Sequence, residues 1–265
     1  MKLYAGIDGG QSSTTAVVGD AGGRVLGRGV AGPADEIGCD ARSTRLKDAL
    51  EGALMAALDD ADLPKDTRFE AVAAGVSGYA GATAGVAPAF NAASARLMHD
   101  APIAHAGALG GKPGVIAIAG TGSVVYGVAE DGRAVTVGGL GYVFGDEGSA
   151  FGIARRAIRE ADGNGALRRR VAAFFGVDSA LDLARAMYAG RVSRDRVASF
   201  AMEMLAARDG TIDRIVDDEV GVTTVAAIGG MTRNAYYMER LGRLVDLVPP
   251  LSEPAIGALR LARGA

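Results

Sequence analysis

Two short segments combine glycine with hydroxyl side chains in a way that suits phosphate binding. We call residues 9–14 the first glycine loop and residues 120–123 the second glycine loop. Backbone N–H groups and short hydroxyls in a tight turn can surround an anion. Such turns also occur in ordinary hairpins, so either loop alone is weak evidence. Together they predict two turns that hold one polyphosphate, through Gly9, Gly10, Gln11, Ser12, Ser13, Thr14, Gly120, Thr121, Gly122 and Ser123.

Two carboxylates stand at the ends of apolar runs. Asp8 follows residues 3–7 directly and lies beside the first glycine loop. A carboxylate there could hold the water shell of a magnesium ion near the phosphates, or it could simply begin a turn. Asp100 ends a short strand and precedes Pro102, which suits the start of a helix. It could cap that helix or accept a proton from a substrate hydroxyl, and the residues alone leave both readings open.

Residues 138–149, which we call the acidic loop, contain five glycines and the adjacent carboxylates Asp146 and Glu147. A plain hairpin does not need such a sequence, which favours a flexible loop that presents both carboxylates to a polar ligand. Further along, Gly229 and Gly230 join a strand to a helix that starts near Asn234. Two glycines at such a joint let a planar base lie against backbone, although many α/β chains have similar joints.

Hydrophobic patterns predict the elements that must position these residues. An antiparallel meander of strands is expected at residues 3–7, 14–18 and 24–30, followed by a helix over 41–61 and a strand over 71–76. A small Ala-rich helix near 83–95 then precedes a short strand that ends at Asp100. The meander recurs at residues 115–119, 124–128 and 134–137, which indicates an internal repeat about 110 residues along. Helices are expected over 149–208, from near Asn234 and over 254–263, with a strand at 224–228.

Composition excludes several classes of protein. The net charge is −3 and charged residues make up 22% of the chain, so no basic field is expected to bind nucleic acid or an anionic membrane. One cysteine, Cys39, allows no internal disulfide and is too few for a thiolate metal site. Residues 1–8 are expected to form a buried strand rather than a signal peptide, which predicts a cytoplasmic location. The forty glycines are expected mainly at turns that let backbone approach a ligand.

Taken in this order, the segments resemble the N-acetylglucosamine kinase branch of the BadF/BadG/BcrA/BcrD ATPase family, within the sugar kinase, Hsp70 and actin superfamily. The resemblance runs along the whole chain. It is strongest at the second glycine loop and the acidic loop, which match the family's GTGS and GGWG…GDEGS patterns. It implies an α/β protein with two ribonuclease-H-like, actin-like ATPase lobes around a nucleotide cleft. These lobes are expected at residues 1–101 and 102–251, with a terminal helix, 252–265, packing back on the first.

The resemblance also implies roles for particular residues. It implies ATP and Mg²⁺ as cofactors, Asp8 as a magnesium ligand through water, and Asp100 as the catalytic base. Adenosine is expected at Gly229, Gly230 and Asn234. The expected sugar-binding residues are Asp35, Ser77, Gly139, Gly141, Asp146 and Glu147. The implied activity is phosphorylation of a hydroxyl of an amino sugar, N-acetylglucosamine or glucosamine, and a homodimer is implied too.

Departures from the family pattern keep two alternatives open. Gln11 replaces the usual third glycine, Leu140 the usual tryptophan, and Asp35 an asparagine that touches the sugar. These changes motivate a sugar or nucleotide sensor that does not turn over. Some relatives instead activate radical dehydratases or reductases through an iron–sulfur cluster bound by cysteines from two subunits. The solitary Cys39 argues against that activity.

Overall fold

The computed structural model describes residues 1–36, 38–207, 215, 226–243 and 247–264. The chain divides into two compact units. The first consists of Met1–Ile116, Tyr126–Ala134 and Pro249–Ala265, and the second of Ala117–Val125 and Val135–Val248. The lobe boundary expected after residue 101 would fall inside a helix of the first unit, α2 (Asp100–Leu109).

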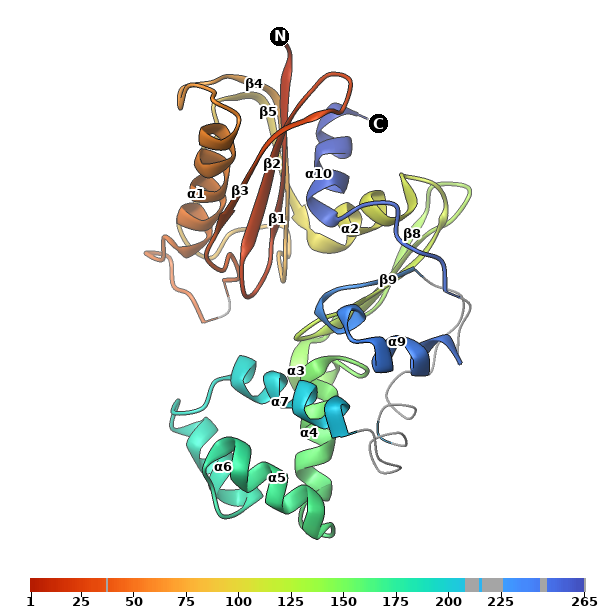
Figure 1. Ribbon diagram of the computed structural model, residues 1–265. Coiled ribbons are helices and arrows are strands. Elements are labelled where there is room, and N and C mark those ends of the chain that lie inside the picture. Colours follow the sequence, from red (N-terminus) through yellow and green to blue (C-terminus); the bar gives the residue numbers. More distant parts are fainter. Residues whose placement is uncertain (37, 208–214, 216–225, 244–246, 265) are drawn as a thin grey trace. The chain divides into compact units, whose positions relative to one another are not determined.

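The first unit is built on a five-stranded sheet in the order β3-β2-β1-β4-β5 (Figure 1). The strands are β1 (Leu3–Gly9), β2 (Thr14–Asp20), β3 (Val25–Ala31), β4 (Phe69–Val76) and β5 (Ala92–His99). The first three form the antiparallel meander predicted from the sequence, and β4 and β5 run parallel to β1. Asp8 pairs with Gly75 and Val76 with His99. The carboxyl ends of three parallel strands therefore meet at one edge of the sheet.

Helices cover both faces of this sheet (Figure 1). On one face lies α1 (Arg45–Asp60), which begins four residues later than predicted and buries Leu46, Leu50, Leu54 and Leu58. On the other lie α2 and α10 (Pro254–Arg263), which pack against each other. The crossing is close, because a Cβ on Gly257 would lie 1.9 Å from the carbonyl oxygen of Ile103. Some of the forty glycines thus serve helix packing, not the approach to a ligand that was expected of them.

The helix predicted near 83–95 is wrong. Residues 82–91 form no helix, and β5 begins at Ala92. The carboxylate of Glu36 accepts the backbone N–H groups of Ala84 and Gly85, at 2.9 and 2.7 Å. Pro88 has no N–H to give to a helix. Alanine content alone was a misleading signal, because the following residues gain a full parallel ladder with β4.

The second sheet repeats the order of the first four strands of the first sheet. Its order is β8-β7-β6-β9, which matches β3-β2-β1-β4 and confirms the predicted internal repeat. The strands are β6 (Gly114–Ala119), β7 (Ser123–Val128), β8 (Ala134–Gly138) and β9 (Ala226–Ile228). The strand predicted at 224–228 lies partly outside the described residues, since only 226–228 are described.

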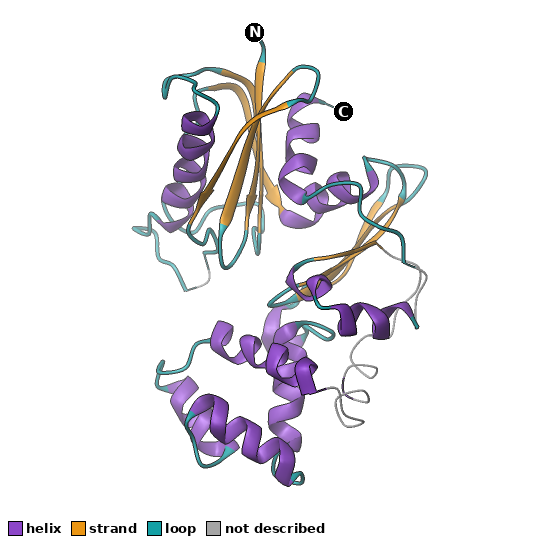
Figure 2. Cartoon of the chain, in the orientation of Figure 1, coloured by secondary structure: helices purple, strands orange, loops and turns teal. Residues whose placement is uncertain are grey.

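The helices predicted over 149–208 are present in the second unit (Figure 2). They are α4 (Ala150–Glu160), α5 (Gly165–Phe175), α6 (Ala180–Tyr188) and α7 (Arg194–Ala207), with the short α3 (Gly141–Phe144) inside the acidic loop. After β9 come a 3₁₀ turn, η1 (Gly230–Arg233), and α9 (Ala235–Gly242). Their core includes Ile153, Leu167, Leu183 and Phe200, all fully buried. Among the described residues, no helix is both long enough and apolar enough to cross a bilayer.

Candidate functional site

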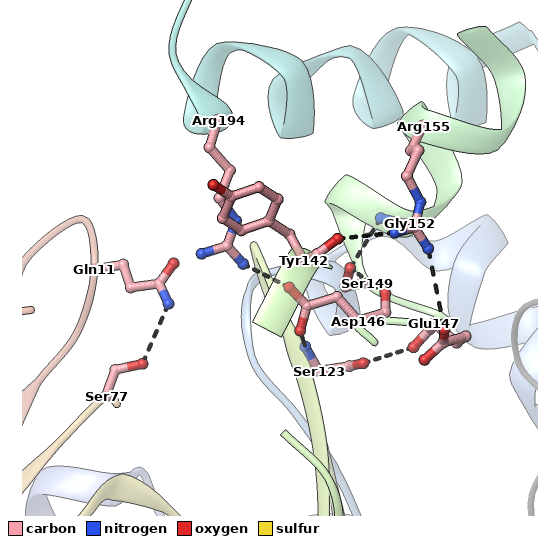
Figure 3. Close-up of polar contacts among 10 residues, drawn as sticks. All are labelled: Gln11, Ser77, Ser123, Tyr142, Asp146, Glu147, Ser149, Gly152, Arg155 and Arg194. Carbon is pink, nitrogen blue, oxygen red and sulfur yellow. Dashed lines mark hydrogen bonds and ion pairs between the residues drawn. The ribbon is translucent and has the colours of Figure 1, made fainter. Parts of the chain in front are cut away.

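The first glycine loop is a tight turn between β1 and β2. Gly10 N–H donates to Ser13 O at 2.9 Å, and Ser12 and Ser13 are exposed at the tip. The Gln11 side chain donates to the Ser77 hydroxyl at 3.4 Å (Figure 3). Thr14 differs from the rest, because its fully buried hydroxyl donates to Gly32 O at 2.8 Å. The exposed part of this loop that could contact phosphate is therefore residues 10–13.

Asp100 lies where β5 becomes α2, at the carboxyl edge of the first sheet. It is the first residue of α2, whose N-cap is His99, so the reading of Asp100 as that cap is wrong. Its side chain is 21% exposed, and its Oδ1 lies 2.8 Å from Nδ1 of His99. A partly buried carboxylate in this place can still accept a proton from a ligand that reaches the strand ends.

Asp8 shares this edge with Asp100 and carries a strongly shifted pKa. Burial, and then the charges of Asp100 and Glu253, raise the pKa of Asp8 to about 7. Glu253, the N-cap of α10, is itself ion-paired with Arg28. The charges of three carboxyl groups are therefore coupled, and the half-buried Asp8 is pushed toward its neutral form.

This environment fits a magnesium ion held in one particular way. A divalent cation would relieve the repulsion between Asp8 and Asp100. Among the described residues, no three His, Cys, Asp or Glu side chains are arranged to chelate a metal directly. A role for Asp8 in holding magnesium through water stays a prediction.

Asp35 and Ser77 flank the first glycine loop. Ser77 N–H donates to Gly9 O at 2.9 Å, and Ala34 N–H donates to Gly10 O at 3.0 Å. Asp35 itself is buried, and its Oδ1 lies 3.5 Å from the guanidinium of Arg45. The structure thus brings two of the predicted sugar-binding residues to the loop predicted to bind phosphate.

The second glycine loop is fastened to α4 by its carbonyl groups. Gly120 O accepts the N–H of Ala150 at 2.9 Å, and Thr121 O accepts that of Phe151 at 3.2 Å. In the described part of the chain, the N–H groups of Thr121 and Gly122 have no hydrogen-bond acceptor. Two successive unpaired N–H groups in a turn form an anion-binding concavity.

The acidic loop differs from the expectation that it would present both carboxylates to a ligand. Asp146 is 3% exposed and has a positive φ of 71°, which is uncommon outside glycine. Its Oδ1 accepts the Ser123 N–H at 3.0 Å, and its Oδ2 lies 2.7 Å from Nη2 of Arg194 (Figure 3). Glu147 is exposed, and its backbone carbonyl accepts the Ser123 hydroxyl at 2.6 Å. Sugar binding by Asp146 and Glu147 stays a prediction.

The glycine joint after β9 lies next to the second glycine loop. A Cβ on Gly229 would lie 2.4 Å from Ala119 O, and Gly229 has a φ of 105°, so only glycine fits. A Cβ on Gly120 would lie 3.9 Å from the N of Gly230, whereas nothing lies within 4 Å of one on Gly230. Asn234 caps α9, because its Oδ1 accepts the Tyr237 N–H at 2.9 Å. The predicted adenosine joint and one predicted phosphate loop are thus neighbours.

Some residues of the site were missed in the sequence. Arg194 contacts Asp146 across 48 positions of sequence, and it belongs to no motif. Arg45 forms an ion pair with Asp35, and the carboxylate of Glu36 accepts a backbone N–H of the segment that follows Ser77. Gly139, which is exposed, and Gly141, which is half-buried, adopt positive φ values of 69° but contact no other predicted site residue closely. Only the start of α7 at a Ser-Arg-Asp sequence could have hinted at Arg194.

Comparisons with known proteins found a matching family model and a matching relative. A family model described as the BadF/BadG/BcrA/BcrD ATPase family matches residues 5–262. The N-acetylmuramic acid/N-acetylglucosamine kinase of Clostridium acetobutylicum is 36% identical over 110 residues, covering 39% of this chain and 36% of that protein. The alignment thus spans little more than a third of that relative's length.

Two solved structures match almost the whole chain. Both are provisionally named N-acetylglucosamine kinases. The one from Chromobacterium violaceum has 26% sequence identity and a TM-score of 0.79, with 99% of both chains covered. The one from Porphyromonas gingivalis has 18% identity and a TM-score of 0.74, with 100% of this chain and 99% of that one covered. The predicted two-lobe α/β fold of the actin-like ATPases is confirmed.

Proposed function

The chain belongs to the BadF/BadG/BcrA/BcrD ATPase family, and from this premise we propose that it is an ATP-dependent kinase of an amino sugar. The observation that carries the proposal is the placement of Asp100. Its carboxylate lies at the carboxyl edge of the first sheet, where its charge raises the pKa of Asp8. A base beside a cation-binding carboxylate is what transfer of a phosphoryl group to a hydroxyl requires.

The two glycine loops would bind the triphosphate. Thr121 and Gly122 supply unpaired N–H groups in the second loop, and residues 10–13 supply an exposed turn in the first. Gly230, open on its Cα side, would lie against adenosine. A magnesium ion held through Asp8 would neutralise phosphate charge.

Asp100 would then act as the general base. It orients a sugar hydroxyl and takes its proton while that oxygen forms a bond to the γ-phosphorus. The bond from the γ-phosphorus to the β–γ bridging oxygen breaks, and ADP leaves. Catalysis by these residues is positioning and electrostatic stabilisation, without a covalent enzyme intermediate.

N-Acetylglucosamine or glucosamine is the substrate that we propose. The support is the similarity to proteins named for kinases of N-acetylglucosamine and N-acetylmuramic acid. Asp35 is the residue whose contacts bear on the choice. Because Arg45 lies 3.5 Å from its carboxylate, its charge is partly compensated and a substrate ammonium is not required beside it.

A coupled ADP-release assay over a panel of sugars tests the proposal. The panel is N-acetylglucosamine, glucosamine, N-acetylmuramic acid and glucose, with a sugar-free reaction as the control for ATP hydrolysis. We expect an amino sugar to raise ADP release well above the sugar-free rate. No rise with any sugar would contradict a kinase and favour a sensor. Light scattering on the same preparation tests the homodimer that we also propose, and fractionation of cells tests the cytoplasmic location.

A further inference from the structure

Arg194 opens α7 and reaches back to the acidic loop. Its Nη2 lies 2.7 Å from Oδ2 of Asp146, and the two side chains are only 16% and 3% exposed (Figure 3). A charge-assisted hydrogen bond at this distance, so far from water, is much stronger than a surface ion pair. The pair therefore fixes the relative position of α7 and the acidic loop.

Two aromatic rings hold the guanidinium in place. Its central carbon lies 5.1 Å from the ring centroid of Tyr142 and 5.7 Å from that of Phe151. The two rings also contact each other edge to face, with centroids 5.4 Å apart. A planar guanidinium packed on such rings is pre-organised, which a lysine ammonium would not be.

The pair lies directly against the second glycine loop. Oδ1 of Asp146 accepts the N–H of Ser123 at 3.0 Å. A Cβ on Gly122 would lie 2.7 Å from that oxygen and 2.9 Å from Nη2 of Arg194. A larger residue at position 122 would therefore have to displace the ion pair, so the loop backbone and the pair lie in direct contact.

The charge of Arg194 matters as much as its position. Without it, the buried carboxylate of Asp146 would stand uncompensated beside the loop that we propose binds phosphate. A negative charge there would repel phosphate, because like charges are poorly screened in a partly buried site. With Arg194 in place, the pair is neutral and still anchors Ser123.

We propose that Arg194 is a positioning residue for nucleotide binding, which acts through Asp146 to hold the second glycine loop and to cancel the carboxylate charge behind it. This inference rests on the proposed function, since it takes the loop to bind the phosphates of ATP. Arg194 lies in neither glycine loop, nor in the acidic loop or the glycine joint.

The experiment compares ATP affinity in two arginine variants of the same helix end. Isothermal titration calorimetry measures the Kd for ATP with magnesium in the wild type, in Arg194→Gln and in Arg196→Gln. Arg196 is the matched control, because it also stacks on a ring, Phe174, at 3.8 Å and donates to a backbone carbonyl, but it does not touch the loop. We expect Arg194→Gln to weaken ATP binding by about tenfold or more, and Arg196→Gln by less than about threefold.

A double-mutant cycle shows whether Arg194 acts through Asp146. If it does, Asp146→Asn should remove both the charge and the need to cancel it, so Arg194→Gln should cost little more in the Asp146→Asn background. Arg194→Lys keeps the positive charge but loses the planar guanidinium that packs on the two rings. It should bind ATP with an affinity between those of the wild type and Arg194→Gln. If Arg194→Gln does not fold, the Kd for ATP of Arg194→Lys still tests the inference.

Three results would overturn the inference. One is an equal loss of ATP affinity in Arg194→Gln and Arg196→Gln at matched thermal stability, which would reduce Arg194 to a packing residue. Another is full additivity of Arg194→Gln and Asp146→Asn. Both leave the kinase proposal standing, since sugar-dependent ADP release by the wild type tests that separately. The third is the absence of ATP binding by the wild type, which would overturn both proposals.

Discussion

Nδ1 of His99 lies 2.8 Å from Oδ1 of Asp100, at the junction of β5 and α2. The same nitrogen lies 3.2 Å from the N of Ala101. One ring nitrogen either donates or accepts, so the two contacts compete. As the cap of α2, this nitrogen accepts from Ala101 and leaves the buried Oδ1 of Asp100 without a hydrogen-bond partner. When the nitrogen carries a proton it can donate to Oδ1 instead, and that contact raises the pKa of His99 while burial opposes the rise. Because Oδ1 is the oxygen that faces His99, Oδ2 is the one that would receive the substrate proton in the proposed reaction.

Replacing Asp100 with Asn should remove the base and leave the nucleotide site intact. An amide keeps the shape of the carboxylate but cannot take a proton. We expect kcat for sugar phosphorylation to fall by about 10²–10⁴-fold, while the Kd for ATP changes by less than about threefold. Coupled ADP release measures kcat, and calorimetry measures the Kd for ATP. Wild-type turnover in Asp100→Asn would show that another group accepts the proton.

Asp8 should make the stability of the magnesium-free protein fall as the pH rises. Its folded pKa, about 7, lies above the ordinary value of 3.8 for an aspartate because of burial and the charges of Asp100 and Glu253. The folded state therefore holds a proton that the unfolded state has released between these two values. Stability is lost across this window, because Asp8 must take up a proton on folding and protons become scarcer as the pH rises.

The Asp8→Asn variant tests whether Asp8 makes the stability fall as the pH rises. In EDTA it should be more stable than the wild type at pH 8, by an amount on the order of a few kcal/mol, and the difference should shrink toward pH 4. Urea unfolding at several pH values measures it. Glu70→Gln, which removes an exposed carboxylate from the same sheet, is the control for the loss of a negative charge. A wild type as stable as Asp8→Asn at pH 8 would contradict the raised pKa.

Much of the fold could be predicted because its signals are local. The meander β1–β2–β3 and its repeat follow from apolar runs broken by glycine turns, and α1 follows from leucines spaced four apart. Asn234 at the start of α9 is a local cap signal of the same kind. Each of these patterns is confined to one element and needs no knowledge of its neighbours.

The parts that could not be predicted depend on contacts between distant residues. Thr14 looks like a phosphate ligand in sequence, but its hydroxyl is taken by Gly32, 18 positions later. Asp146 looks exposed in a glycine-rich loop, but Arg194 and Ser123 draw it inside. Residues 92–95 favour a helix by composition, and pairing with β4 makes them a strand. In each case a tertiary partner decides what the local sequence leaves open.

The glycine joint offers a test of the adenosine site by itself. Gly230→Ala should leave the fold intact, because nothing lies within 4 Å of the added methyl group. If adenosine lies there, the methyl group should weaken ATP binding by about tenfold or more, as a steric clash in a preformed site does. Thermal unfolding and ATP calorimetry separate the two effects. Unchanged ATP affinity in a folded Gly230→Ala would place adenosine elsewhere.

The neighbouring glycine is the matched comparison. In Gly229→Ala the methyl group would lie 2.4 Å from Ala119 O, at a φ of 105°. We therefore expect Gly229→Ala to lose several kcal/mol of stability, through strain and overpacking together. Equal stability of the two variants would mean that the close approach of η1 to β6 is absent in solution.

The close crossing of α2 and α10 should depend on the absence of a side chain at Gly257. In Gly257→Ala, the new Cβ would lie 1.9 Å from Ile103 O and 2.4 Å from Gly107 N, both backbone atoms that cannot rotate away. The two helices must then separate, and we expect a loss of several kcal/mol in the free energy of unfolding.

Gly52→Ala is the control for the same substitution in a helix with room for it. Its added Cβ would have only the Cβ of Ala31 nearby, at 3.6 Å, an ordinary contact. Alanine also has the better helix propensity, so this variant should gain about 0.5–1 kcal/mol. Urea unfolding of both variants beside the wild type measures the difference. If Gly257→Ala unfolds at the same urea concentration as Gly52→Ala, then α10 does not pack on α2 at this distance.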